Sequence, residues 1–117
     1  MTASSIIDFN HLEKYVAGDD ELRDEILEIF SDQVALLMDQ FDVFQVDEEW
    51  KNTAHTLKGA ARGVGAWNLG EVCQEAESLV GSSPGKQEAR ATLLVTLRFM
   101  ASDAMDEAKR FRLAAAI

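Results

Sequence analysis

The sequence predicts an all-α fold, an up-down antiparallel four-helix bundle with a short additional N-terminal helix. Helix-favouring residues are abundant, whereas the 117 residues include only seven Gly and one Pro to interrupt helices. Apolar residues recur at steps of three and four along four long segments, and no segment alternates as a strand does. Four apolar stripes joined by short connections are buried most simply in a bundle, with the short first helix laid across one end.

The chain has the size and composition of one domain, and we expect residues 1–117 to form it. Hydrophobic residues make up 47% of the chain, which is enough for a core without disulfide bonds. We expect residues 1–7 and 114–117 to be frayed tails. A single Cys, no apolar run of about 18 residues and no signal-peptide pattern together favour a cytoplasmic protein.

The first two helices are predicted from their caps and apolar spacing. Asp8 is suited to cap a short first helix that Gly18 ends, and Asp19 or Asp20 is suited to cap the second. The apolar positions of the first helix are Phe9, Leu12 and Val16. Those of the second follow Leu22 and are Ile26, Ile29, Phe30, Val34, Leu37, Met38 and Phe41. The opposite face of the second helix is acidic, as expected of a solvated face.

The same signals place three more helices. Asp47 is expected to cap the third, and Gly63 and Gly65 mark its end. Its predicted buried stripe is Trp50, Ala54, Leu57, Ala61 and Val64. The fourth helix, which precedes the turn-forming residues 81–85, carries Leu69, Val72, Cys73, Ala76, Leu79 and Val80. The fifth runs from about Lys86 towards Leu113. Its stripe is Leu94, Leu97, Ala101, Ala104, Ala108 and Phe111.

Composition excludes several functions. A formal net charge of −10 argues against nucleic acid or an anionic membrane as the partner. A carboxylate-bridged metal site needs Glu-x-x-His pairs, whereas Asn52 precedes His55 and Asp8 precedes His11 at that spacing. Cys73 lies on an apolar stripe and is expected to be a core residue. We therefore expect no metal site and no bound cofactor in this chain.

One stretch of the chain departs from the general acidity. The 21 residues 50–70 contain no acid, although an even distribution would place about four there. They do contain Lys51, Lys58 and Arg62, so the net charge divides into +3 over this stretch and −13 over the rest. This basic patch is the strongest functional signal in the charge pattern.

Helical geometry places a histidine within the basic patch. At about 100° per residue, the face away from the buried stripe carries Lys51, His55, Lys58, Gly59 and Arg62. A neutral imidazole is a good nucleophile for phosphorus. Lys58, one turn from His55, can offset the charge of a phosphoryl group, and Gly59 keeps the space beside the ring open. A lone exposed histidine is more often an ordinary surface residue, but this setting suits a phosphoryl carrier.

The sequence around His55 also matches a known pattern. Residues 55–66 read His-Thr-Leu-Lys-Gly-Ala-Ala-Arg-Gly-Val-Gly-Ala. This segment closely resembles the signature of histidine-containing phosphotransfer (HPt) domains: His-x-Leu-Lys-Gly, two small residues and a following aliphatic-Gly pair. Leu69, Cys73 and Glu77 also resemble the next helix of that family. Ala76 departs from it, since a larger aliphatic residue is commoner there, and this affects packing more than chemistry.

The resemblance implies a role for each residue. His55 would accept the phosphoryl group, Lys58 would be its neighbour, and Gly59 would give a partner protein access to the ring. Lys51 and Arg62 are added from the helical geometry as docking contacts for a receiver domain.

The resemblance also implies the function and the partners. HPt domains are phosphoryl carriers rather than enzymes, and they shuttle phosphoryl groups between receiver-domain aspartates in bacterial-type two-component phosphorelays. This chain would accept the group from a receiver-domain aspartate or a hybrid sensor kinase and pass it to the receiver domain of another response regulator. Mg²⁺ is expected on the partner receiver, whose acidic pocket complements the basic patch. Such transfer needs only a monomer.

Two other functions stay open. The dimerisation and phosphoacceptor segment of a sensor kinase also exposes a helical histidine, but an acidic residue commonly follows that histidine, whereas Thr56 follows here. An acidic helical adaptor that binds its partner without phosphotransfer is not excluded by residue spacing.

Overall fold

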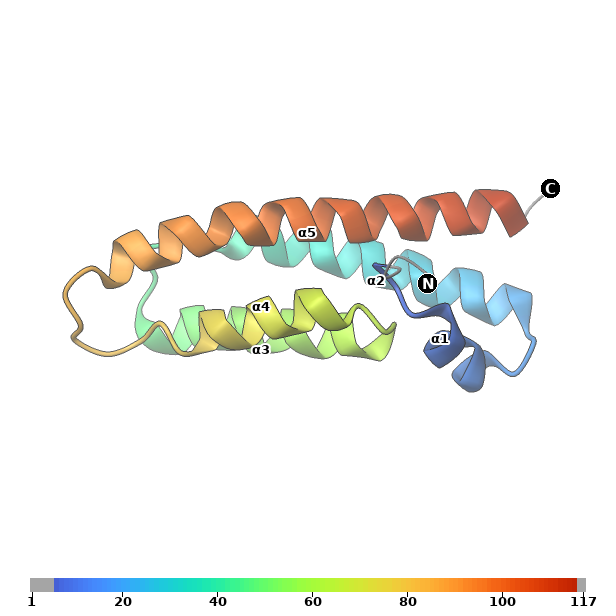
Figure 1. The fold of residues 1–117 in the computed structure, drawn as a ribbon, viewed down its shortest axis with the longest axis horizontal. Coiled ribbons are helices and arrows are strands. Elements are labelled where there is room, and N and C mark those ends of the chain that lie inside the picture. The colour runs from blue at the N-terminus through green and yellow to red at the C-terminus, as the bar shows by residue number, and fades with distance from the viewer. Residues whose placement is uncertain (1–5, 116–117) are drawn as a thin grey trace, which may run out of the picture.

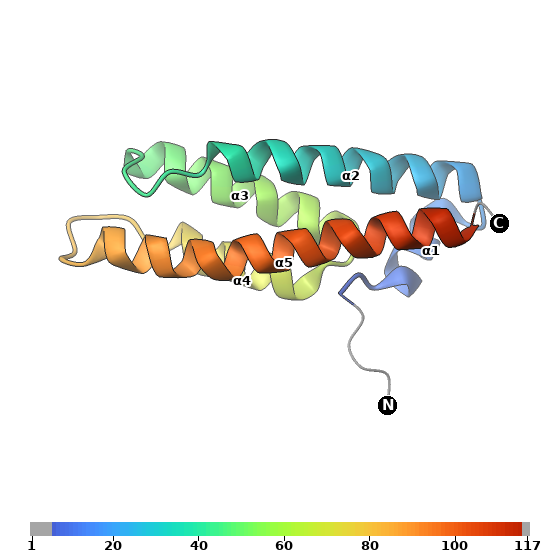
Figure 2. The same ribbon diagram turned by 90° about the horizontal axis from the view of Figure 1, so that it is seen from above.

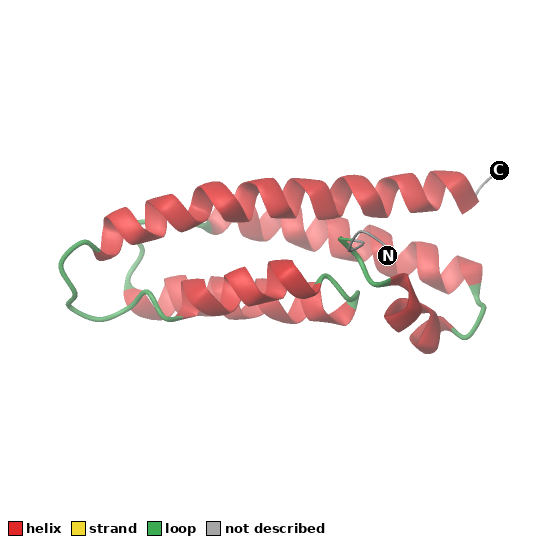
Figure 3. Ribbon diagram, viewed as in Figure 1, coloured by secondary structure: helices red, strands yellow, loops and turns green. Residues whose placement is uncertain are grey.

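The structure is a computed structural model that describes residues 6–115 of the chain. Within that range it contains five α-helices and no β-strand, so the all-α prediction is confirmed (Figure 3). The helices are α1 (Phe9–Val16), α2 (Asp20–Gln40), α3 (Asp47–Gly63), α4 (Trp67–Glu77) and α5 (Lys86–Ala115). None of the helices in these residues is both long and apolar enough to span a membrane.

The four longer helices lie side by side (Figures 1 and 2). α3 packs against α4 and α2, and α5 packs against α2 and α4. The colours in Figure 1 show that each of these helices runs opposite to the one before it. α2 and α5 extend beyond the shorter α3–α4 pair at one end, where α1 contacts α2. The molecule is therefore elongated, with extents of 51 × 29 × 20 Å.

The predicted stripes of α3 and α5 form much of the core. All five members of the α3 stripe are buried: Trp50, Ala54, Leu57, Ala61 and Val64. In α5 the buried members are Leu94, Leu97, Ala101, Ala104 and Ala108, and Phe111 is partly buried. The small alanine side chains let neighbouring helices approach closely. α4 is shorter than predicted because it ends at Glu77, so Leu79 and Val80 pack against the core from the loop that follows.

The α2 stripe differs from the prediction at two positions. Ile29 is predicted to face the core, but it is 59% exposed, and Leu27, which is absent from the predicted stripe, is fully buried. Apolar residues stand at adjacent positions here, as in Ile26-Leu27 and Ile29-Phe30. Spacing alone does not choose between such neighbours, because either choice fits a period of 3.6. The packing of α2 against α3 and α5 determines which of these residues is buried.

Both predicted tails include residues that belong to the fold. Ile7 falls within the predicted tail 1–7, yet it is fully buried, and its backbone N–H donates to the Glu107 carboxylate at 3.2 Å. At the other end α5 continues through Ala115, into the predicted tail 114–117. Alanine has the strongest intrinsic helix preference, which favours this extension. The rest of the two predicted tails, residues 1–5 and 116–117, lies outside the described residues.

Two of the predicted helix caps are confirmed and one is wrong. The Asp8 carboxylate accepts the His11 N–H at 3.2 Å, and the Asp19 carboxylate accepts the Leu22 N–H at 3.0 Å. Asp47 does not cap α3, because Val46 occupies the cap position without a side-chain bond.

The Asp47 carboxylate instead joins a cluster of polar groups at the end of the bundle where α5 begins. It accepts hydrogen bonds of 2.8 Å from the Gly81 N–H, the Lys86 ammonium and the Arg90 guanidinium. Arg90 is fully buried and also donates to three backbone carbonyls, those of Val43, Gln45 and Leu79. These bonds tie the α2–α3 and α4–α5 connections together, a use of Asp47 that local sequence does not reveal.

Candidate functional site

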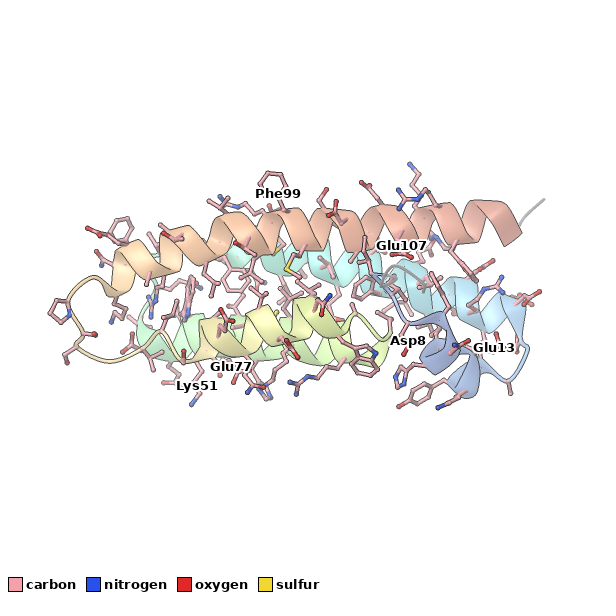
Figure 4. All side chains as sticks on the ribbon, viewed as in Figure 1. Asp8, Glu13, Lys51, Glu77, Phe99 and Glu107 are labelled. Atoms are coloured by element: carbon pink, nitrogen blue, oxygen red, sulfur yellow. The ribbon has the colours of Figure 1, made fainter. Side chains whose placement is uncertain are left out.

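The predicted site residues lie on α3, on its face away from the core. His55, Gly59 and Arg62 are exposed, as is Lys51 one turn before His55, while the side chain of Lys58 is mostly buried. The buried stripe of α3 fixes this outward orientation, because residues at other helical angles must point away from the core. The His55 side chain is 70% exposed, so its ring is open to another protein. Lys51 points away from the bundle in Figure 4 and makes no ion pair within residues 6–115.

A glutamate from α4 completes the site. Oε1 of Glu77 lies 2.6 Å from Nζ of Lys58 and 3.4 Å from Nδ1 of His55. Glu77 is the last residue of α4, and the packing of α4 against α3 brings it to the site (Figure 4). The side chains of Lys58 and Glu77 are each only 15% exposed, so this ion pair is largely shielded from water.

The charge state of Glu77 follows from its neighbours. Burial of the carboxyl raises its pKa, but the hydrogen bond and the charge of Lys58, with a further contribution from His55, outweigh burial. The pKa of Glu77 therefore lies below its ordinary value of 4.5, and Glu77 is a carboxylate at neutral pH.

The Glu77 carboxylate makes the two ring nitrogens of His55 chemically different. Nδ1 is the ring nitrogen that lies within 4 Å of the Glu77 carboxylate, so a proton on Nδ1 is the one that this carboxylate attracts. The geometry favours the tautomer in which Nδ1 carries the proton and Nε2 keeps its lone pair. Nε2 of the exposed imidazole is then the available nucleophile.

Gly59 leaves open space on the surface of α3 near His55. Gly59 stands one turn after His55 in the middle of α3, and a Cβ built there would have nothing within 4 Å. A mid-helix glycine costs up to about 1 kcal/mol relative to alanine, and no close packing of the bundle requires it here. Open space beside the ring is what a second protein needs to approach Nε2.

Arg62 lies across α4. A Cβ built on Gly70 would stand 3.2 Å from Cγ of Arg62, and the Arg62 guanidinium donates to the Gln74 side chain at 2.9 Å. Because Gly70 has no side chain, the aliphatic part of the Arg62 side chain can pass over it. The guanidinium remains exposed, one turn beyond Lys58 along α3.

Two further groups near the site have other roles. The Thr56 hydroxyl donates to the backbone carbonyl of Asn52 at 2.8 Å, so the residue after His55 is engaged within its own helix. Cys73 is fully buried, and burial, with the nearby charge of Glu77, raises the pKa of its thiol to about 12. The prediction that Cys73 is a core residue is confirmed, and its protonated thiol is a poor nucleophile. Residues 6–115 hold no cluster of three or more His, Cys, Asp or Glu side chains suited to a metal ion.

Helical spacing predicts that five of these residues share one face of α3, but it does not assign Glu77 to the site. Nineteen positions separate Glu77 from Lys58 (77 − 58 = 19), so helical spacing within α3 says nothing of it. The signal in the sequence was the likeness of the Leu69, Cys73 and Glu77 pattern to the next helix of the HPt family. The ion pair itself is a consequence of how α4 packs on α3.

Comparisons with known proteins show which family the chain resembles. A family model described as the Hpt domain matches residues 20–110. Among solved structures, the chain is similar to the histidine phosphotransferase ShpA from Caulobacter crescentus, with 41% sequence identity and a TM-score of 0.59. That match covers 91% of this chain and 97% of the other. No curated protein matches the sequence significantly.

Proposed function

Because the chain belongs to the Hpt domain family, we propose that His55 is the residue on which it carries a phosphoryl group in a two-component phosphorelay. The single observation that carries this assignment is the exposed His55 ring, with Lys58 one turn away and open space at Gly59. His11, the chain's other histidine, is partly buried between the rings of Tyr15 and Trp67, which makes it a poor alternative.

The proposed reaction moves a phosphoryl group between a carboxylate and an imidazole. Nε2 of His55 attacks the phosphorus of an aspartyl phosphate on a receiver domain, the N–P bond forms, and the P–O bond breaks. The electron pair of the broken bond returns to the aspartate, which is released as a carboxylate. The reverse step passes the group to the aspartate of another receiver domain. Lys58 offsets the charge of the phosphoryl oxygens in both directions.

Hpt proteins are phosphoryl carriers rather than classical enzymes, and Hpt domains interact with receiver domains of two-component systems. We assign the catalysis of each transfer to the partner receiver, which would hold the Mg²⁺, so this chain needs no cofactor. The donor is a receiver-domain aspartate or a hybrid sensor kinase. Lys51 and Arg62 are proposed to dock against the acidic rim of the receiver pocket.

The remaining parts of the proposal concern the protein as a whole. We propose that α2 to α5 form an up-down antiparallel four-helix bundle with α1 as a short addition, and that residues 1–117 are a single domain. The protein would work as a monomer in the cytoplasm and bind neither nucleic acid nor membrane, in keeping with its net charge of −10.

The test is to incubate the protein with phosphorylated receiver domains and look for acid-labile, base-stable label. We expect label on the parent and on His11→Gln, but none on His55→Gln. His11→Gln is the matched control because it removes the chain's other imidazole. Label that persists in His55→Gln would refute His55 as the carrier. Binding of receivers without any label would favour the alternative, an acidic helical adaptor with no phosphotransfer.

A further inference from the structure

One carboxylate oxygen lies between the two groups that the proposed chemistry uses. Oε1 of Glu77 is 2.6 Å from the Lys58 ammonium and 3.4 Å from Nδ1 of His55. Within residues 6–115, Glu77 is the only acidic residue that forms an ion pair with Lys58. Lys58 is therefore already paired before any phosphoryl group arrives.

A phosphoryl group on Nε2 changes the charges around this oxygen. A phosphoryl group brings about −1.5 to −2 charges at neutral pH and three acceptor oxygens. These oxygens would attract the Lys58 ammonium away from Glu77, and the Glu77 carboxylate would repel them. The side chains of Lys58 and Glu77 are mostly shielded from water, so screening by solvent is weaker than at an open surface.

We propose that Glu77 is a positioning residue that makes the phosphorylated form less stable, because its carboxylate competes with the phosphoryl group for Lys58 and holds the proton on Nδ1 of His55. This inference rests on the proposed function and concerns the regulation of the same site. Its consequence is that the carrier gives up its phosphoryl group more readily than a carrier with a neutral residue at position 77.

The role of the Nδ1 proton follows from the bonds that change. When the phosphoryl group leaves, the N–P bond breaks and its electron pair returns to Nε2. If Nδ1 carries a proton in the phosphorylated ring, the ring is cationic and leaves as a neutral imidazole. The carboxylate of Glu77 beside Nδ1 raises the fraction of phosphorylated rings that carry this proton, and these rings lose the phosphoryl group more readily than rings that would have to leave as an anion. The acceptor of the phosphoryl group is a receiver aspartate or, in slow hydrolysis, water.

The experiment measures how long the phosphohistidine survives without any receiver domain. The protein is phosphorylated with the small-molecule donor phosphoramidate, freed of the donor, and followed by the loss of acid-labile label at neutral pH. We expect the half-life of the phosphohistidine in Glu77→Gln to be about three- to tenfold longer than in the parent. Glutamine keeps the size of the side chain and one acceptor oxygen but removes the charge.

Glu75→Gln is the matched control. Glu75 is on the same helix and loses the same charge, but it is exposed and makes no ion pair within residues 6–115. We expect its half-life to stay within about twofold of the parent. Lys58→Met should shorten the half-life of the phosphohistidine, because it removes the cation that offsets the phosphoryl charge. Urea unfolding of each variant shows whether the fold is retained.

The outcomes separate this inference from the proposed function. A Glu77→Gln half-life equal to or shorter than the parent's would overturn the role of Glu77, even where receiver domains exchange label with His55. Slower loss in Glu77→Gln would support it, even where no receiver exchanges label and the relay function fails. The absence of phosphohistidine with either donor would overturn both. A structural role alone would also leave the ring tautomer unchanged, whereas we expect ¹⁵N NMR to show less Nδ1-protonated His55 in Glu77→Gln.

Discussion

The guanidinium of Arg90 lies 4.5 Å from the centroid of the Trp50 ring, so a fully buried cation covers a fully buried indole. Trp50 in turn donates its ring N–H to the Ala76 carbonyl at 2.6 Å. This pair connects the beginnings of α3 and α5 to the end of α4, next to Glu77. These buried contacts therefore fix the position of α4 relative to α3, the helix that carries His55.

We expect Arg90→Met to lower the free energy of unfolding by about 2–4 kcal/mol, because the Asp47 carboxylate and three carbonyls lose their shared donor. Urea unfolding measures the change. Arg98→Met is the control, since Arg98 is on the same helix but exposed. A loss below about 0.5 kcal/mol in Arg90→Met would contradict the importance of these bonds.

We expect the protein to lose stability as the pH is lowered below neutral, and we expect part of that loss to come from protonation of Asp47. Hydrogen bonds from Lys86 and the Gly81 N–H hold the pKa of this carboxyl below its ordinary value of 3.8. A lowered pKa contributes stability that is present above pH 3.8 and is lost as the pH falls through the folded-state pKa. Urea midpoints measured from neutral pH down through this range should therefore fall less in Asp47→Asn than in the parent. Asp32→Asn, which changes an exposed acid without an ion pair in residues 6–115, should follow the parent.

We expect Gly59→Glu to keep the fold and to block phosphotransfer. A Cβ at position 59 would meet nothing within 4 Å, so we expect the bundle to tolerate the change, while the longer, charged glutamate side chain one turn from His55 should obstruct the partner. Gly59→Ala is the graded control: it should raise stability by up to about 1 kcal/mol and reduce transfer only mildly. Circular dichroism and a receiver transfer assay distinguish these effects. Transfer by Gly59→Glu at the parent rate would show that the partner approaches from elsewhere.

We expect Lys51→Gln and Arg62→Gln each to slow transfer with a receiver domain about two- to fivefold at low ionic strength, and less at high salt. Both side chains are exposed on the His55 face of the protein. Lys109→Gln removes an exposed charge from α5 instead and should transfer at the parent rate. Equal rates for all three variants, with the same salt dependence, would place the docking surface elsewhere.

Burial is predicted correctly for residues whose surroundings depend mainly on the periodicity of their own helix. Trp50, Leu57 and Ala61 are buried as their spacing predicts, because one face of a helix must be covered. Asp47 is the counterexample. Its local sequence suits a helix cap, but its carboxylate is bonded to Lys86 and Arg90, which stand about 40 residues later in the chain. Long-range donors of this kind leave no periodic signal.

The sequence by itself determined that the protein is helical, that His55 shares an exposed face of its helix with Lys51, Gly59 and Arg62, and that this face is locally basic. These properties depend on the repeat of a single helix and on composition. The tertiary structure decided which of Leu27 and Ile29 is buried and that Glu77 pairs with Lys58 beside His55. Those outcomes depend on how two helices pack, because an ion pair between residues far apart in the chain forms only when packing brings their side chains within reach.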